Sequence, residues 1–181
     1  EGQLYLFGGW DGAQAVADVY VYDPLDDAWH EGTPMVTAKY DGGAVSLVDK
    51  IVVLGGRNEG GALKEAQAYY PSRDGNGESP WEDFPELPEP MYGFGAASVS
   101  ETIYVVGGQF FEESGINSQS FVYANEDWIS FDTNKDYSGE QIELVFLGSS
   151  LFIVDPAELL NQTQLWEYQI YYFSIYIPFV P

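Results

Sequence analysis

Short apolar runs alternate along the chain with small turns, and one kind of run returns at a nearly fixed spacing. A hydrophobic strand followed by two glycines occurs at residues 4–9, 51–56 and 103–108, at steps of 47 and 52 residues. A period of this size, with several strands and turns in each unit, is typical of propeller-type repeat arrays. Frequent turn residues between short apolar runs also favour an all-β chain.

Two further markers keep the same order as the glycine pairs. A strand with alternating pattern ends at Tyr22-Asp23-Pro24, and its counterpart ends at Tyr70-Pro71. Tryptophans precede the next glycine pair, or its replacement, by 26, 26 and 27 residues, at Trp29 to Gly55, Trp81 to Gly107 and Trp128 to Asp155. Because this spacing holds across loops of different length, we expect one repeat domain over residues 1–181. Its units are expected at about 1–40, 41–91, 92–139 and 140–181.

Together these markers resemble the kelch repeat, well over residues 3–133 and weakly over residues 140–177. The resemblance implies a kelch-like β-propeller, or a partial propeller, of four-stranded antiparallel blades. In that arrangement the glycine-pair strands, residues 4–7, 51–54 and 103–106, are expected to be the inner strands. The spaced tyrosines and tryptophans are expected to pack between neighbouring blades.

The chain departs from the usual kelch pattern in two ways. It supplies only about four units, and Glu1 directly precedes a glycine-pair strand without the small-residue strand that precedes the later ones. An open array of this kind exposes strand edges and invites association. Three explanations stay open: the chain is a fragment of a longer protein, residues 171–177 return to fill the place, or an oligomer or partner chain completes the ring.

The charge of the chain excludes several classes of partner. The net charge is −23, from 29 acidic and 6 basic residues, whereas nucleic acids and anionic membrane surfaces require a basic footprint. No apolar run approaches the roughly 20 residues of a spanning helix, so we expect no membrane insertion. The chain has no cysteine, which leaves the compartment undecided; we favour an extracellular or cell-surface location.

No residue pattern points to catalysis. His30 is the only histidine and lies beside Trp29, and a working general base needs a positioned partner that the sequence does not indicate. We therefore predict no catalytic residue. The alternative is a carbohydrate-active enzyme with acidic residues in the axial channel, which needs two carboxylates roughly 5 to 10 Å apart.

Two acidic loops are candidate calcium sites, and calcium is the one cofactor that we predict. Oxygen-bearing side chains alternate in both loops, as in calcium-binding loops, at Asp74, Asn76 and Glu78 and at Asp132, Asn134 and Asp136. Turn-forming Asp and Asn side chains explain the same pattern without an ion.

The loops after the glycine-pair strands are the predicted binding face, because loops at one end of a rigid scaffold carry function. Their candidate contact residues are Trp10, Asp11, Arg57, Asn58, Gln109, Phe110 and Phe111. Aromatic and arginine side chains are enriched at contact hot spots. We predict a non-catalytic binding or structural module that recognises a protein or a carbohydrate. The alternative is a subunit of a larger extracellular or surface assembly in which a partner completes the propeller.

Overall fold

The computed structural model describes residues 2–112, 115–117, 119–133, 137, 142–155 and 164–169, and every regular element in them is a β-strand. The predicted all-β class is confirmed. Sheet 1 has the order β1-β2-β3, with strands β1 (Leu4–Trp10), β2 (Ala15–Asp23) and β3 (Ala28–Gly32). Sheet 2 has the order β4-β5-β8-β9, with strands β4 (Gly43–Ser46), β5 (Ile51–Leu54), β8 (Ala66–Tyr69) and β9 (Trp81–Phe84).

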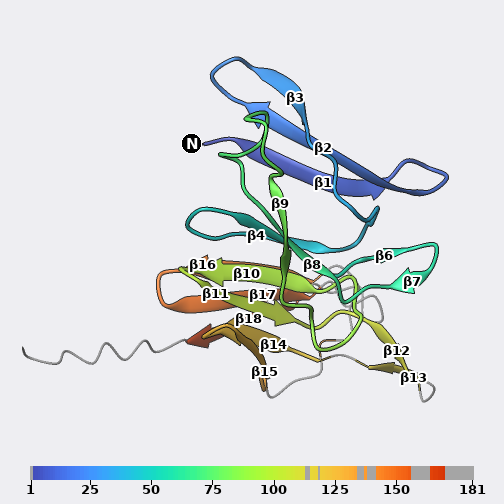
Figure 1. The fold of residues 1–181 in the computed structure, drawn as a ribbon. Helices are drawn as coiled ribbons and strands as arrows, with labels where there is room; N and C mark the ends of the chain where they lie inside the picture. Colours follow the sequence, from blue (N-terminus) through green and yellow to red (C-terminus); the bar gives the residue numbers. More distant parts are fainter. Residues whose placement is uncertain are drawn as a thin grey trace, which may run out of the picture.

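The second half of the chain repeats this plan. Sheet 3 has the order β10-β11-β14-β15, with strands β10 (Gly95–Val99), β11 (Thr102–Val106), β14 (Phe121–Ala124) and β15 (Asp127–Ser130). Sheet 4 has the order β16-β17-β18, with strands β16 (Glu143–Leu147), β17 (Ser150–Asp155) and β18 (Gln164–Gln169). All pairings are antiparallel. Sheets 2 and 3 confirm the predicted four-stranded unit, and Figure 1 shows sheet 1, in blue, beside sheet 2 at one end of the array.

The later two glycine-pair strands, β5 and β11, are not the innermost strands, which corrects the sequence-based expectation for residues 51–54 and 103–106, whereas β1 is an edge strand of sheet 1. β5 and β11 lie second in their sheets, and the small-residue strands β4 and β10 form the edges. Strand β10 contacts both β4 and β16, so these edges are where successive sheets meet. The small residues allow this approach, because a Cβ atom added to Gly43 would lie 2.9 Å from the Cβ of Ala96, and one added to Gly95 would lie 2.7 Å from Cγ of Leu144.

Aromatic side chains connect each sheet to the one before it, as predicted. The indole of Trp81 in sheet 2 donates a hydrogen bond to the carbonyl of Thr33, 3.0 Å away, which follows sheet 1. Trp128 in sheet 3 donates in the same way to the carbonyl of Pro85, 2.9 Å away, which follows sheet 2. A buried tryptophan needs such a partner for its N–H, so the repeated tryptophan fixes the position of each sheet on its predecessor.

The glycine pairs turn the chain where a side chain would not fit. Gly55 has φ +49, and an added Cβ would lie 2.7 Å from the carbonyl oxygen of Met91. Gly107 has φ +69, and an added Cβ would lie 2.1 Å from Cδ1 of Ile142. Positive φ is a conformation that glycine adopts at no steric cost. The pairs therefore let each strand end against the segment that leads into the following sheet.

Strand β1 forms one edge of sheet 1, and a hollow of about 670 Å³ separates it from β4. Residues of both strands line this hollow, among them Tyr5 and Val45. Residues 171–177, predicted as one way to fill this place, lie outside the described residues. In the described part of the chain there is no helix that could cross a membrane.

Candidate functional site

The loops after the glycine-pair strands form hairpins along one side of the array of sheets. Strands β1 and β2 extend as far as the pair Trp10 and Ala15. Two short hairpins follow the next glycine pairs: β6 (Arg57–Asn58) with β7 (Gly61–Ala62), and β12 (Phe110–Glu112) with β13 (Gly115–Asn117). Figure 1 shows all three hairpins on the same side of the molecule.

Backbone hydrogen bonds attach each of the later hairpins to the segment that leads into a sheet. Tyr40 and Arg57 exchange two such bonds, of 3.0 and 2.8 Å. Tyr92 and Gln109 form the equivalent pair, with bonds of 3.1 and 2.8 Å. Each tyrosine stands shortly before a small-residue strand, and each partner directly follows a glycine pair. The repeat thus brings the same two positions together twice.

The side chains at these positions form one continuous row, which we call the aromatic row (Trp10, Tyr40, Arg57, Tyr92 and Gln109). The rings of Trp10 and Tyr40 have centroids 5.2 Å apart. The guanidinium carbon of Arg57 lies 4.9 Å from the centroid of Tyr40 and 4.3 Å from that of Tyr92. The hydroxyl of Tyr92 donates to Oε1 of Gln109 at 3.0 Å. Trp10 is exposed, Tyr40 and Arg57 are half-buried, and Tyr92 and Gln109 are buried.

Asp41 holds the guanidinium of Arg57 in place. Its Oδ2 accepts from Nε of Arg57 at 2.8 Å and lies 2.7 Å from Nη2. Burial alone would lower the pKa of Arg57, but the hydrogen bond and charge of Asp41 outweigh it and raise the pKa. A charge-assisted contact through two nitrogens fixes the plane of a guanidinium as well as its position. The guanidinium of Arg57 is therefore held close to both tyrosine rings.

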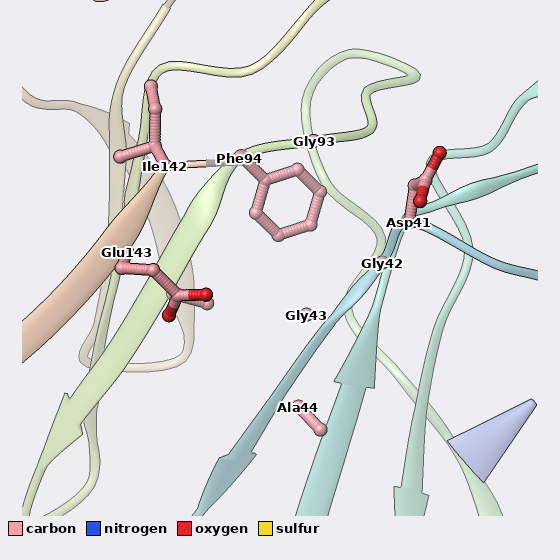
Figure 2. A pocket seen from close by; sticks show the side chains of 9 residues that line it. Asp41, Gly42, Gly43, Ala44, Gly93, Phe94, Ile142 and Glu143 are labelled. Atoms are coloured by element: carbon pink, nitrogen blue, oxygen red, sulfur yellow. The ribbon is translucent and has the colours of Figure 1, made fainter. Parts of the chain in front are cut away.

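A pocket of about 470 Å³ lies beside the aromatic row, where sheets 2, 3 and 4 begin. Its lining is mostly small or apolar, with Gly42, Gly43, Ala44, Gly93, Phe94, Ala96 and Ile142, and it includes the carboxylates of Asp41 and Glu143. Figure 2 shows Asp41 and Glu143 on opposite sides of the ring of Phe94. The pocket is within the usual size range of ligand sites.

The other predicted contact residues have different roles or fall outside the description. Oδ1 of Asp11 accepts from the backbone N–H of Ala13 at 2.7 Å and of Gln14 at 2.8 Å, which lowers the pKa of its carboxyl. Asn58 donates to the carbonyl of Ala38 at 3.3 Å and accepts from the N–H of Gly60 at 2.9 Å. Both side chains thus shape their loops. Phe110 and Phe111 belong to β12, and their side chains lie outside the described part.

The first predicted calcium loop uses its aspartate within the protein. The carboxylate of Asp74 accepts hydrogen bonds from the hydroxyl of Tyr69 and from the N–H and hydroxyl of Thr33. Asn76 donates to the carbonyl of Ser72 at 2.6 Å. Within the described residues, no group of three or more His, Cys, Asp or Glu side chains could hold a metal ion.

The second predicted calcium loop is only partly covered by the structure. Asn134 and Asp136 lie outside the described residues. Calcium binding therefore stays a prediction. His30, the single histidine, lies exposed on β3, as a surface residue would.

Sequence reasoning missed Tyr40, Asp41 and Tyr92, although a signal for the tyrosines is present. Tyr40 and Tyr92 are 52 residues apart, the same step that separates Gly55 from Gly107. Each is followed within three residues by a small-residue strand. Alignment of the units on these strands, as well as on the glycine pairs, would have placed both tyrosines at one repeated position.

Comparison with known proteins supports the repeat type. Residues 1–36 match the Kelch motif family. The chain is 32% identical over 107 residues to Kelch-like protein 23 of Mus musculus, covering 58% of this chain and 18% of that protein. It is 25% identical over 165 residues to Kelch-like protein 40 of Xenopus tropicalis, covering 90% of this chain and 26% of that protein. The predicted resemblance to the kelch repeat is confirmed, and the chain spans only about a fifth to a quarter of the length of these relatives.

Proposed function

We propose that this kelch-repeat chain is a non-catalytic protein-binding module and that the aromatic row is its contact surface. The observation that carries the proposal is the position of Arg57 between Tyr40 and Tyr92, continued to the exposed ring of Trp10. Tryptophan, tyrosine and arginine are enriched among the few residues that dominate the binding energy of protein interfaces. In this chain the tryptophan, tyrosine and arginine side chains come from different repeats and lie together on one side of the array of sheets.

The row is organised before any partner binds. Asp41 fixes the guanidinium of Arg57, and Gln109 accepts a hydrogen bond from the hydroxyl of Tyr92. Ordering a side chain on binding costs about 0.5 to 1.5 kcal/mol. Because these contacts already order the row, a partner would meet a surface that loses little further entropy.

The charge of the chain favours a partner with a basic surface. The net charge is −23, and the pocket beside the row carries the carboxylate of Glu143, while that of Asp41 is already paired with Arg57. Opposite charge on a partner accelerates encounter and contributes to specificity. We propose that a lysine or arginine side chain of the partner enters this pocket while its neighbouring residues lie on Trp10 and Tyr40.

Two features support a role without catalysis. One of the two pocket carboxylates, Asp41, is already engaged by Arg57, so it is not available as a simple acid–base partner for Glu143. His30 lies exposed on β3, a strand of sheet 1, and is not among the residues that line the pocket.

The proposal can be tested by affinity capture with a matched pair of arginine variants. Arg73 also stacks on a tyrosine, 3.8 Å from the centroid of Tyr70, and also pairs with a carboxylate, that of Glu82. Arg73 lies after Tyr69, the last residue of β8, whereas the glycine pair of sheet 2 lies near Ala66, the first residue of β8. The two arginines are therefore at opposite ends of sheet 2. We expect partners recovered with the unchanged chain and with Arg73→Ala to be lost with Arg57→Ala.

A purified partner then gives the quantitative result. Loss of a hot-spot side chain costs about 2 kcal/mol or more, so Arg57→Ala should raise Kd by about 30-fold or more. Thermal melting of both variants verifies that each still folds. Equal capture by the unchanged chain and by Arg57→Ala, or equal loss with Arg73→Ala, would contradict the proposal.

A further inference from the structure

The loop that follows β8 contains a pair of residues that can react with each other. Asn76 is the one asparagine in the chain that is directly followed by a glycine. In such a pair the backbone nitrogen of the glycine can attack the carbonyl carbon of the asparagine side chain, because glycine has no Cβ atom to hinder the approach and adopts many backbone conformations. The sequence thus singles out Asn76 among the asparagines of the chain.

The structure leaves this pair accessible. Asn76 and Gly77 are both exposed, in the turn that runs from residue 71 to residue 77. Gly77 has φ +85, and a Cβ atom added to it would have no heavy atom within 4 Å apart from its chain neighbours. Within the described residues, no backbone carbonyl accepts a hydrogen bond from the N–H of Gly77. The attacking nitrogen is therefore not engaged in the backbone hydrogen bonding of the loop.

The neighbouring pair Asp74-Gly75 is protected from the same reaction. Burial tends to raise the pKa of Asp74, but hydrogen bonds from Thr33 and Tyr69 outweigh it and keep the pKa below the usual 3.8. The carboxyl group therefore stays ionised near neutral pH. An ionised carboxylate is a poor target for a nucleophile, whereas the side-chain amide of Asn76 is neutral.

We propose that Asn76 is a site of spontaneous deamidation. The nitrogen of Gly77 forms a bond to Cγ of Asn76, and the bond between Cγ and Nδ2 breaks. Nδ2 leaves as ammonia with the proton from the N–H of Gly77, so a cyclic imide remains. Water then opens the ring at either carbonyl and gives aspartate or isoaspartate. Water is the co-reactant, and the attacking and leaving groups both belong to the chain.

The products cannot make the contacts of Asn76. Nδ2 of Asn76 donates to the carbonyl of Ser72 at 2.6 Å, and a carboxylate has no donor to replace it. The new charge also lies in the same short loop as Asp74 and Glu78, in a chain with a net charge of −23, so it adds to the repulsion between like charges. Isoaspartate in addition inserts a methylene into the main chain close to Asp74.

The position of Asp74 gives this change a consequence for the fold. Asp74 connects the loop, which belongs to sheet 2, to Thr33, which follows sheet 1. A Cβ atom added to Gly32 would lie 3.1 Å from Oδ2 of Asp74, so the two segments are closely packed. Deamidation of Asn76 is therefore expected to weaken the contact between sheets 1 and 2, although Asp74 itself does not react.

Incubation of the 181-residue chain at mildly alkaline pH tests the proposal, since the attack requires the deprotonated nitrogen of Gly77. Peptide mass spectrometry at intervals should show aspartate and isoaspartate in place of Asn76. Asn125 is the matched control, because it is exposed in the turn between β14 and β15 but precedes Glu126. We expect Asn76 to react about tenfold faster or more, which corresponds to a barrier lower by about 1.4 kcal/mol. Equal rates at the two asparagines would overturn the proposal, as would a reaction at Asn76 in the urea-unfolded chain alone.

Two variants separate the reaction from its consequence. Asn76→Gln keeps a side-chain amide but forms a cyclic imide far more slowly, so incubation should leave its melting temperature unchanged. Asn76→Asp carries the charge of one product from the start and should melt at a lower temperature than the unchanged chain, with a smaller difference in the Asp74→Asn background. An equal loss on incubation for Asn76→Gln, or normal melting of Asn76→Asp, would contradict the expected weakening. Neither result depends on the aromatic row, because Asn76 does not belong to it.

Discussion

The guanidinium of Arg57 lies 4.3 Å from the ring centroid of Tyr92, although the two residues belong to different repeats. Arg57 follows the glycine pair of sheet 2, and Tyr92 belongs to the segment that leads into sheet 3. The contact therefore links two sheets as well as forming part of the aromatic row. Arg57 is expected to contribute to stability and to binding through the same geometry.

Replacing Arg57 by glutamine should destabilise the fold by about 1 kcal/mol, because each cation–π contact contributes about 0.5 to 1 kcal/mol at a partly exposed site. The Arg73→Gln variant loses a similar stack and ion pair within one sheet, and it should cost less than half as much. Urea unfolding followed by circular dichroism measures both changes. A loss of stability in Arg73→Gln as large as that in Arg57→Gln would contradict the expectation that the contact between sheets adds to stability.

The repeated tryptophans should differ sharply in their contribution to stability. Trp81 is buried between sheets 1 and 2, and its indole donates to Thr33, so Trp81→Ala should cost about 3 to 5 kcal/mol. Trp29 stacks on Tyr22 but is exposed, so Trp29→Ala should cost about 1 kcal/mol or less. Denaturant unfolding of the two variants gives the comparison. Equal losses would contradict the exposure of the Trp29 ring.

The fold could be predicted from the sequence wherever a marker fixes the local backbone. Gly55 and Gly107 must turn with positive φ, and Trp81, which is buried, and Trp128, which is partly buried, each place a large ring whose N–H needs a hydrogen-bond partner. These requirements act on single residues, so the residues recur at a regular spacing in the sequence. The position of β4 and β10 at the sheet edges could not be predicted, because it is set by contacts between sheets. Residue spacing along the chain does not reveal such contacts.

The candidate site was predicted in part. Trp10, Arg57 and Gln109 share one position after the glycine pairs, and the structure brings them into one row. Tyr40 and Tyr92 share one repeated position, but they were missed because they reach this row through isolated backbone pairs with Arg57 and Gln109, outside the main strands. The pairing of Asp41 with Arg57 was missed for the same reason.

Gln67 should be a position where an apolar side chain improves stability. It is buried in β8, and within the described residues its Oε1 has no hydrogen-bond partner. The equivalent residues on β2 and β14 are Tyr20 and Phe121, which pair with Leu6 and Val105 as Gln67 pairs with Val53. Gln67→Met should therefore stabilise the fold by about 1 kcal/mol.

The isosteric variant Gln67→Glu serves as the control for this substitution. It places a carboxylate at the same buried position, so it should lower the melting temperature while Gln67→Met raises it. Differential scanning calorimetry compares the two. A lower melting temperature for Gln67→Met would indicate that the amide makes contacts that stabilise the fold.

Asp74 should make part of the stability dependent on acid pH. Burial tends to raise the pKa of its carboxyl, but hydrogen bonds from Thr33 and Tyr69 outweigh it and hold the pKa below the usual 3.8. A carboxyl with a lowered pKa in the folded state stabilises at pH above the unfolded value and loses this contribution as pH falls through the folded value. The contribution of Asp74 is therefore complete near neutral pH and lost in the range below 3.8.

The Asp74→Asn variant measures this contribution. It should melt at a lower temperature than the unchanged chain at about pH 7, and the two curves should approach each other at about pH 2.5. Asp83→Asn, on the exposed part of β9, is the control for the loss of one carboxylate and should lower the melting temperature at pH 7 by less than Asp74→Asn does. A constant difference between the Asp74→Asn and unchanged chains across this range would contradict the assignment.

The glycine pairs have a consequence for how the contact surface can change. Each pair fixes the backbone by itself, and the residue directly after it, at Trp10, Arg57 and Gln109, is already different in every repeat. Each repeat thus presents a different side chain at the same position of the scaffold. In two repeats this position lies beside a tyrosine, Tyr40 or Tyr92. Single substitutions at these positions can therefore change what the surface binds while the glycine pairs keep the backbone of the fold unchanged.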